Sequence, residues 1–180
     1  MPDEIEVKIL EINPRHVISC LESLGAQKIL EARLKIREYD YPNGSLGKDK
    51  SILRIRSEGD KVVLCYKQRI IKSDFKVSDE HQVIVSDLEE ACVIFEKLGF
   101  KRIGDKEKDR VSYLLRDIHY DIDKWPRIPA YMEVEAPSKA LVQQGVELIG
   151  FSMAQTTSMT GTEVLKKYGI DVDKEKVFKF

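Results

Sequence analysis

The feature that most constrains the fold of this chain is an alternation of charged and aliphatic residues that recurs in at least six segments. In EIEVK (4–8), Glu4, Glu6 and Lys8 occupy every second position, and aliphatic residues fill the positions between them. A period of two sends successive side chains to opposite faces of a β-strand, so each segment is predicted to be a strand with one ionic and one apolar face. Similar alternation occurs at 34–39, 53–56, 108–112, 121–123 and 133–135.

Helix and turn signals separate these segments. Asn13 or Pro14 can begin a helix that Gly25 ends, and Asp87 can cap a second helix that ends before Gly99. Two more helices are predicted over about 138–149 and 161–168. A turn is predicted at 42–45, and strands are predicted over 28–42, 51–57, 61–68, 79–87, 110–117, 118–125 and 130–136.

The apolar stripes of these helices need a surface to cover, and the apolar strand faces can supply it. If the sheet curls with its helices outside, the ionic faces turn toward one another across a charged, solvent-filled interior. The sequence therefore predicts an α+β fold in which helices pack outside an antiparallel β-barrel. The chain of 180 residues fits one domain, 1–180.

Composition excludes several classes of partner and site. The 30 basic residues nearly balance the 31 acidic ones, which argues against nucleic acid and against an anionic membrane surface. No apolar run approaches the roughly 20 residues of a membrane helix, and the acidic start lacks the features of a signal peptide. Cys20, Cys65 and Cys92 are widely spaced, so we expect reduced thiols and a cytoplasmic protein. The three histidines are not closely spaced with the cysteines, which argues against a zinc site.

The recurring charges themselves indicate a chemistry. Guanidinium and ammonium groups bind phosphate oxygens, and clustered carboxylates bind hard divalent cations. Both kinds of group in one cavity predict a site for a metal ion and a polyphosphate, which needs no serine, cysteine or histidine nucleophile.

EIEVK resembles the ExExK signature of the CYTH superfamily, the triphosphate tunnel metalloenzymes, which include class IV adenylyl cyclases, thiamine triphosphatases and inorganic triphosphatases. Further matching motifs follow in order: LRIR (53–56), YK (66–67), Glu80, LGF and then KDR between 98 and 110, DxD (121–123) and EVE (133–135). The resemblance covers about residues 3–169, and DKWPRIPAYMEVE (123–135) is similar to a bacterial branch often labelled class IV cyclase.

The resemblance implies an eight-stranded antiparallel tunnel that binds Mg²⁺ or Mn²⁺ and a small-molecule triphosphate such as ATP, thiamine triphosphate or tripolyphosphate. The metal ligands or their supports would be Glu4, Glu6, Asp121, Asp123, Glu133 and Glu135. The phosphate ligands would be Lys8, Arg54, Arg56, Lys67, Lys108 and Arg110. Lys8 and Asp123 would be catalytic, with Lys8 tuning a reacting group and Asp123 assisting the metal or the attacking water.

Two positions depart from the family pattern. Gln82 stands where a second acid often follows Glu80, and Asp109 stands where many members carry a basic residue. The structural alternatives are a solvated strand face for the acids and an internal ion-pair network for Arg54 and Arg56.

The motifs leave the reaction open. Hydrolysis of an organic or inorganic triphosphate is favoured slightly, because it needs fewer special features than cyclisation of ATP to cyclic AMP and pyrophosphate. A non-catalytic polyphosphate- or nucleotide-binding module is a third interpretation, although binding alone would need mainly the cations. The sequence does not decide the metal preference or whether the protein forms a homodimer.

Overall fold

The computed structural model describes residues 4–72, 74–172 and 174–180, with only the backbone described at positions 4, 71 and 72. The strands are β1 (Glu4–Ile9), β2 (Gln27–Asp40), β3 (Ser51–Glu58), β4 (Lys61–Lys72), β5 (Lys76–Val85), β6 (Lys101–Leu115), β7 (Ile118–Lys124), β8 (Tyr131–Ala136), β9 (Thr156–Thr157) and β10 (Val177–Phe178). The helices are α1 (Pro14–Ser23), α2 (Ser45–Lys48), α3 (Leu88–Lys97), α4 (Lys139–Leu148), the 3₁₀ turn η1 (Met153–Gln155) and α5 (Gly161–Lys167).

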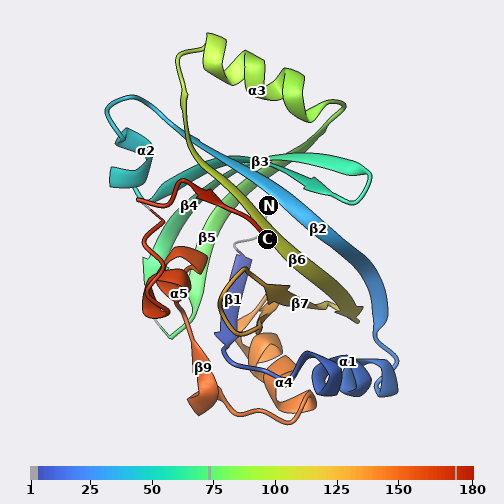
Figure 1. Ribbon diagram of the computed structural model, residues 1–180. Coiled ribbons are helices and arrows are strands. Elements are labelled where there is room, and N and C mark those ends of the chain that lie inside the picture. Colours follow the sequence, from blue (N-terminus) through green and yellow to red (C-terminus); the bar gives the residue numbers. More distant parts are fainter. Residues whose placement is uncertain (1–3, 73, 173) are drawn as a thin grey trace.

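The strands close into the predicted eight-stranded antiparallel barrel (Figure 1). The order β6-β2-β3-β4-β5-β1-β8-β7 returns to its start through the pairing of β7 with β6. All eight of these pairings are antiparallel. Two short strands lie outside the ring: β9 pairs with β1, and β10 runs parallel to β6. The fold prediction is therefore confirmed.

Helices cover the outer face of the barrel at two places, as the apolar stripes require (Figure 1). Below, α1 and α4 share a core with the outward residues of β1, β7 and β8, including Val7, Tyr120 and Val134. Above, α3 covers the outer face of β2, β3 and β4, where Tyr39 meets Phe95 edge to face at a centroid distance of 5.2 Å. Burying the aliphatic faces outside leaves the ionic faces directed inward.

The helix boundaries follow the predicted caps. The Asn13 side chain accepts hydrogen bonds from the amides of Arg15 and His16, and the Asp87 side chain accepts one from the amide of Glu90. Gly25 follows α1 with φ of +76°, a left-handed conformation that glycine adopts without strain.

Three strand boundaries differ from the prediction. β6 begins at Lys101 rather than at residue 110, because residues 101–114 pair along almost the whole of β2. β5 begins at Lys76 and β4 extends to Lys72, so both are longer than the sequence pattern indicates. The helix α2 occupies a segment for which no helix is predicted.

The charged face expected for residues 34–39 points outward. Arg37 donates to Glu89 of α3 at 2.6 Å, and Lys35 is exposed. Leu34 and Ile36 belong instead to an apolar cluster with Tyr131 and Leu165. The reversal has a physical cause: α3 offers partners for Arg37 and Tyr39, and α5 covers the apolar side chains on the opposite face.

Among the described residues, no helix is both long enough and apolar enough to cross a membrane. Cys20, Cys65 and Cys92 are free thiols.

Close packing of α4 on the barrel depends on Gly145. A β-carbon at this position would lie 2.9 Å from Ile118 and 3.0 Å from Val134. We expect Gly145→Val to lower the free energy of unfolding by about 1–3 kcal/mol, because overpacking forces these side chains apart. Gln144→Val places the same side chain at an exposed position on the same helix and should change stability by less than about 0.5 kcal/mol. Equal unfolding midpoints for both variants in urea would contradict this account.

Candidate functional site

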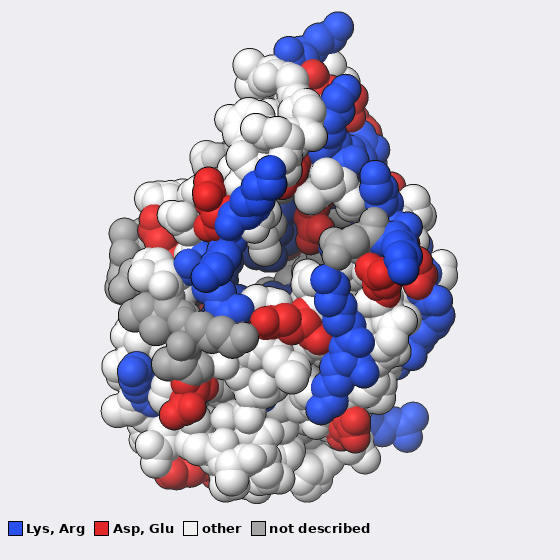
Figure 2. All heavy atoms as spheres, turned by 90° about the vertical axis from the view of Figure 1, so that its left-hand side faces the viewer, with Lys and Arg blue, Asp and Glu red and all other residues white. Residues whose placement is uncertain are grey.

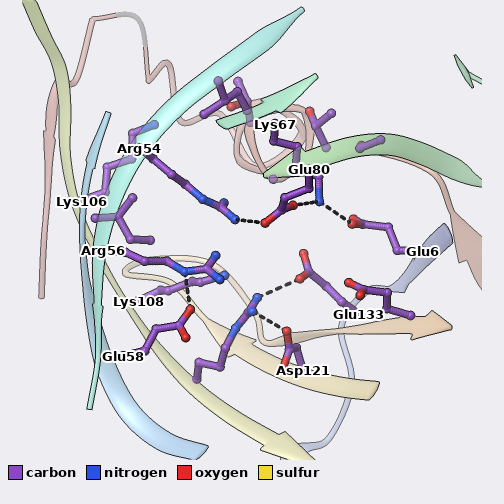
Figure 3. Close-up of a pocket in the computed structure, with 18 of the residues that line it drawn as sticks. Glu6, Arg54, Arg56, Glu58, Lys67, Glu80, Lys106, Lys108, Asp121 and Glu133 are labelled. Atoms are coloured by element: carbon purple, nitrogen blue, oxygen red, sulfur yellow. Dashed lines mark hydrogen bonds and ion pairs between the residues drawn. The ribbon is translucent and has the colours of Figure 1, made fainter. Parts of the chain in front are cut away.

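The barrel encloses a cavity of about 1340 Å³ that all eight of its strands line, together with the first turn of α5. Figure 2 shows the molecule hollowed on one face, with basic and acidic side chains around the opening. The inward set is the one that strand alternation selects, since residues two apart along each strand share a face. Figure 3 shows these side chains converging from different strands.

Glu6 and Lys8 of β1 stand at the centre of one group of charges. Lys8 bonds to Glu6 and lies 3.1 Å from Glu133 of β8. Glu6 also has Lys76 at 3.0 Å and Lys67 at 3.5 Å. The register of the sheet produces this group, because Lys8 pairs with Glu133 and Glu6 with Glu135 and Lys76.

Arg110 of β6 organises a second group of charges. Its guanidinium donates to Asp123 at 2.6 and 2.7 Å, to Glu133 at 2.8 Å, and to Asp121. Lys108 donates to the same Asp123 carboxylate at 2.6 Å. Asp123 is fully buried, and both of its carboxylate oxygens accept hydrogen bonds from these two cations. This arginine therefore has most of its donors satisfied within the protein.

The opposite wall, formed by β3 and β4, is basic and less completely paired. Arg54 approaches Glu80 only to 3.7 Å, whereas Lys67 lies 2.7 Å from Glu80. Arg56 pairs with Glu58, and Figure 3 shows Arg54 and Arg56 extending from neighbouring positions toward the cavity. The Nε of Arg54 is buried and has no hydrogen-bond acceptor among the described residues. Donors in this state favour an anionic ligand.

Mutual pairing shifts the pKa values of the central groups. Burial by itself would raise the pKa of Glu133, but Lys8, Arg110 and Lys108 hold it well below its usual range. Burial would likewise lower the pKa of Lys8, but Glu133 and Glu6 raise it. Glu133 is therefore a carboxylate, and Lys8 is an ammonium, at neutral pH.

Two other lysines of the cavity have lowered pKa values. Burial lowers the pKa of Lys76 to about 8, and Glu6 opposes this shift only in part. Burial and the charge of Arg110 lower the pKa of Lys108 to about 8, against the pull of Asp123. Both ammonium groups therefore begin to lose their protons just above neutral pH.

Most of the predicted site residues line the cavity, and Glu4 and Asp123 are the two exceptions. The side chain of Glu4 lies outside the described residues. Asp123 lies beneath Lys108 and Arg110 instead of forming part of the cavity surface. The remaining predicted residues line the cavity: Glu6, Lys8, Arg54, Arg56, Lys67, Lys108, Arg110, Asp121, Glu133 and Glu135. The roles assigned to all of them stay predictions.

Several cavity residues were not predicted. Lys76 and Ser78 share the inward face of β5 with Glu80, and Arg69 follows Lys67 on β4. Lys106 of β6 donates to Glu38 at 2.5 Å and precedes Lys108 by two residues. The same alternation could have identified all of them, had the strands been extended beyond their strongest motifs.

The two departures from the family pattern have local explanations. Asp109 points outside the barrel, where its carboxylate accepts hydrogen bonds from Arg33 at 2.7 and 2.9 Å. Gln82 lines the cavity and donates to Glu80. Trp125 is buried, and its indole donates to Tyr131 at 2.9 Å.

The acidic residues suit a divalent cation by type. Glu6, Glu133 and Glu135 offer only oxygen donors, which Mg²⁺ and Mn²⁺ prefer. Among the described side chains, however, no three acidic, histidine or cysteine residues are grouped closely enough to hold an ion as they stand. Lys8 occupies the space between Glu6 and Glu133, so a cation would compete with its ammonium for these oxygens.

The structure is a closed antiparallel barrel with a charged interior, and comparison with known proteins shows the family to which it belongs. The CYTH domain model matches residues 3–160, and the chain belongs to that family. The resemblance inferred from the sequence motifs is therefore confirmed.

One curated relative is a Methanocaldococcus jannaschii protein named "putative adenylate cyclase", 31% identical over 135 residues that cover 73% of this chain and 75% of the relative. Solved structures show the same fold at lower identity. A Vibrio parahaemolyticus protein named "putative adenylate cyclase" has a TM-score of 0.81 at 15% identity, covering 92% of this chain and 98% of that one. A Hippeastrum protein described as a "putative adenylyl cyclase" with a dominant triphosphatase activity has a TM-score of 0.64 at 15% identity, with coverage of 95% and 97%.

The lowered pKa values of Lys76 and Lys108 predict a pH dependence of anion binding. Both lysines are mainly charged at pH 7 and mainly neutral at pH 9, so binding a polyanion at pH 9 requires proton uptake. We expect the dissociation constant for tripolyphosphate, measured calorimetrically with a chelator present, to rise about tenfold per lysine between pH 7 and 9. Lys76→Arg keeps its charge at pH 9 and should remove part of this rise. An affinity that does not vary across this range would exclude the assignment.

Proposed function

We propose that this protein is a divalent-metal-dependent enzyme that hydrolyses a triphosphate compound inside the barrel. The observation that supports this most is the opposition of two walls in one cavity. The β3–β4 wall carries Arg54 and Arg69, whose buried Nε atoms have no acceptor among the described residues, and the β1–β8 wall carries the ionised carboxylates of Glu6 and Glu133. A polyphosphate with its bound cation has the complementary distribution of charge.

Arg54, Arg56 and Lys67 are the proposed principal phosphate ligands. Guanidinium groups can bind phosphate oxygens in bidentate fashion, and Lys67 adds a point charge beside them. Lys8, Lys108 and Arg110 are the remaining proposed ligands. Each of these three already binds carboxylates, so contact with phosphate would exchange one partner for another.

The proposed metal ligands are Glu6, Glu133 and Glu135, with Glu4, Asp121 and Asp123 as further ligands or supports. A bound Mg²⁺ or Mn²⁺ would neutralise charge on the phosphoryl group and lower the pKa of water. Glu6 and Glu133 are already ionised, because Lys8 and the other cations around them lower the pKa of each carboxyl group. Hence no proton has to leave them before a cation binds.

In the proposed hydrolysis, a water oxygen forms a bond to the terminal phosphorus as the bridging bond breaks. The electron pair of that bond goes to the leaving diphosphate, and the proton of the water passes to an oxygen of the transferred phosphoryl group, which leaves as orthophosphate. Asp123 and Lys8 are the proposed catalytic groups. Asp123 lies behind Lys108 and Arg110, so we propose that it acts by orienting these two cations. We propose that Lys8 stabilises charge beside Glu133, one of the proposed metal ligands.

Cyclisation of ATP to cyclic AMP and pyrophosphate is the second candidate. The 31% identical relative carries the name of an adenylate cyclase. The cavity of about 1340 Å³ also exceeds the roughly 300–1,000 Å³ of typical small-molecule pockets, so a nucleoside has room beside the phosphates.

A substrate panel separates these functions. Purified protein is incubated with tripolyphosphate, thiamine triphosphate and ATP, each with Mg²⁺, with Mn²⁺ or with a chelator. We expect metal-dependent release of orthophosphate from at least one compound. Cyclic AMP with pyrophosphate would identify the cyclase instead, and saturable binding without turnover of any compound would identify a binding module.

Two substitutions test the assignment of the walls. Glu133→Gln should abolish metal-dependent turnover while tripolyphosphate still binds in the presence of a chelator, because it removes a proposed metal ligand. Arg56→Ala should raise KM by about 10- to 100-fold with a smaller change in kcat. Glu107→Gln alters an acid on the outer face of β6 and should change neither constant. A cooperative unfolding transition for each variant would show that it is folded. Wild-type kinetics for both Glu133→Gln and Arg56→Ala would refute the assignment.

A further inference from the structure

We propose that Arg69 and Ser78 form an additional phosphate subsite, next to α5, that makes the cavity select three linked phosphates over two. This inference rests on the proposed function, since it specifies how the same cavity reads its substrate. Neither residue belongs to the motifs that identify the family. Both line the cavity, and they are direct partners across β4 and β5.

Arg69 is a nearly buried cation whose own partners are weak. Its side chain is 13% exposed, yet Nη1 lies 3.5 Å from Glu163 and Nη2 lies 3.4 Å from the carbonyl of Ser158. Its Nε is buried without an acceptor among the described residues. Arg110, by contrast, makes several contacts of 2.6–2.8 Å to carboxylates. A buried guanidinium with spare donors lacks the compensation that an anionic ligand would supply.

Ser78 supplies the second, independent observation. Its side chain is 1% exposed, and its hydroxyl has no hydrogen-bond partner among the described residues. It faces the cavity beside Arg69. Leaving a buried hydroxyl unpaired destabilises a protein, so its presence here indicates a partner other than the described residues, which a bound ligand would supply.

The subsite lies further along β4 than the proposed phosphate ligands, at a distance that a longer chain of phosphates can reach. Lys67 and Arg69 are two residues apart on one face of β4, so their α-carbons lie about 6–7 Å apart along the strand. Each of them, together with its partner on β5, forms one row of side chains across the cavity wall. Within the Lys67 row, Glu80 already pairs with the lysine, whereas the row of Arg69 and Ser78 presents a cation and a neutral hydroxyl. A chain of two phosphates can satisfy Arg54, Arg56 and Lys67, and a third phosphate reaches Arg69 and Ser78.

A structural alternative assigns Arg69 only to holding α5 against the barrel through Glu163 and Ser158. The two accounts differ in the effect of phosphate number. A subsite for the third phosphate affects triphosphate binding and spares diphosphate binding. A strap for α5 affects both ligands alike, because it acts through the shape of the whole cavity.

The test compares binding of tripolyphosphate and pyrophosphate by calorimetry, with a chelator present, for the wild-type protein and its variants. Arg69→Met should raise the dissociation constant of tripolyphosphate by about 10- to 100-fold and that of pyrophosphate by less than about threefold. Ser78→Ala should weaken tripolyphosphate binding by about two- to tenfold while keeping or raising the melting temperature, because the lost hydroxyl has no described protein partner. Arg33→Met removes an exposed cation outside the barrel and should change both constants by less than about threefold.

Glu163→Gln separates the accounts by the sign of its effect. It removes the charge that faces Arg69 but keeps an oxygen able to accept from the amide of Thr160. The subsite predicts that tripolyphosphate affinity is kept or raised, whereas the strap predicts a loss like that of Arg69→Met. Equal losses for both ligands in Arg69→Met, or a loss in Glu163→Gln, would overturn the subsite. If the wild-type protein binds neither ligand, the proposed function itself fails.

Discussion

The whole structure depends on the pairing of opposite charges inside a closed sheet. Removing a carboxylate or an ammonium from water is costly unless a partner of opposite charge replaces the solvent. Glu6 and Glu133 therefore each meet more than one cation, and Arg110 meets three carboxylates. Because these partners come from different strands, the ion pairs also join β6, β7, β8 and β1, which are successive strands of the barrel.

Under the proposed function, this pairing couples the two ligands to each other. Phosphates that attract Lys8 or Arg110 would leave Glu133 without its compensating charge, and a divalent cation would then restore the balance. Binding of either ligand would thus favour binding of the other, which is a reciprocal thermodynamic coupling between neighbouring positions. A cavity filled with its own ion pairs can stay folded in the absence of ligands and still receive both.

Alternation along the strands was enough to predict the barrel and most of its inward charges, because a side chain's face depends only on the parity of its position. It failed for residues 34–39, where tertiary partners decided the outcome: Arg37 found Glu89 on α3, and Ile36 joined the cluster around α5. It also failed at strand ends. Arg69, Lys76 and Lys106 lie where β4, β5 and β6, respectively, extend past their motifs. This extension results from pairing with neighbouring strands, which the sequence of a single segment does not show.

The position of β1 between β5 and β8 has a consequence for how the chain reaches its native state. Ile5 pairs with Val77, which is more than 70 residues away in the sequence, and with Ala136, which is more than 130 residues away. The pairing of β1 therefore requires two contacts between segments far apart in the chain. Loop closure over such separations slows the search for native contacts. During synthesis, the segment that bears Glu6 and Lys8 emerges long before β8, and its charged edge discourages premature pairing with other chains until the ring can close.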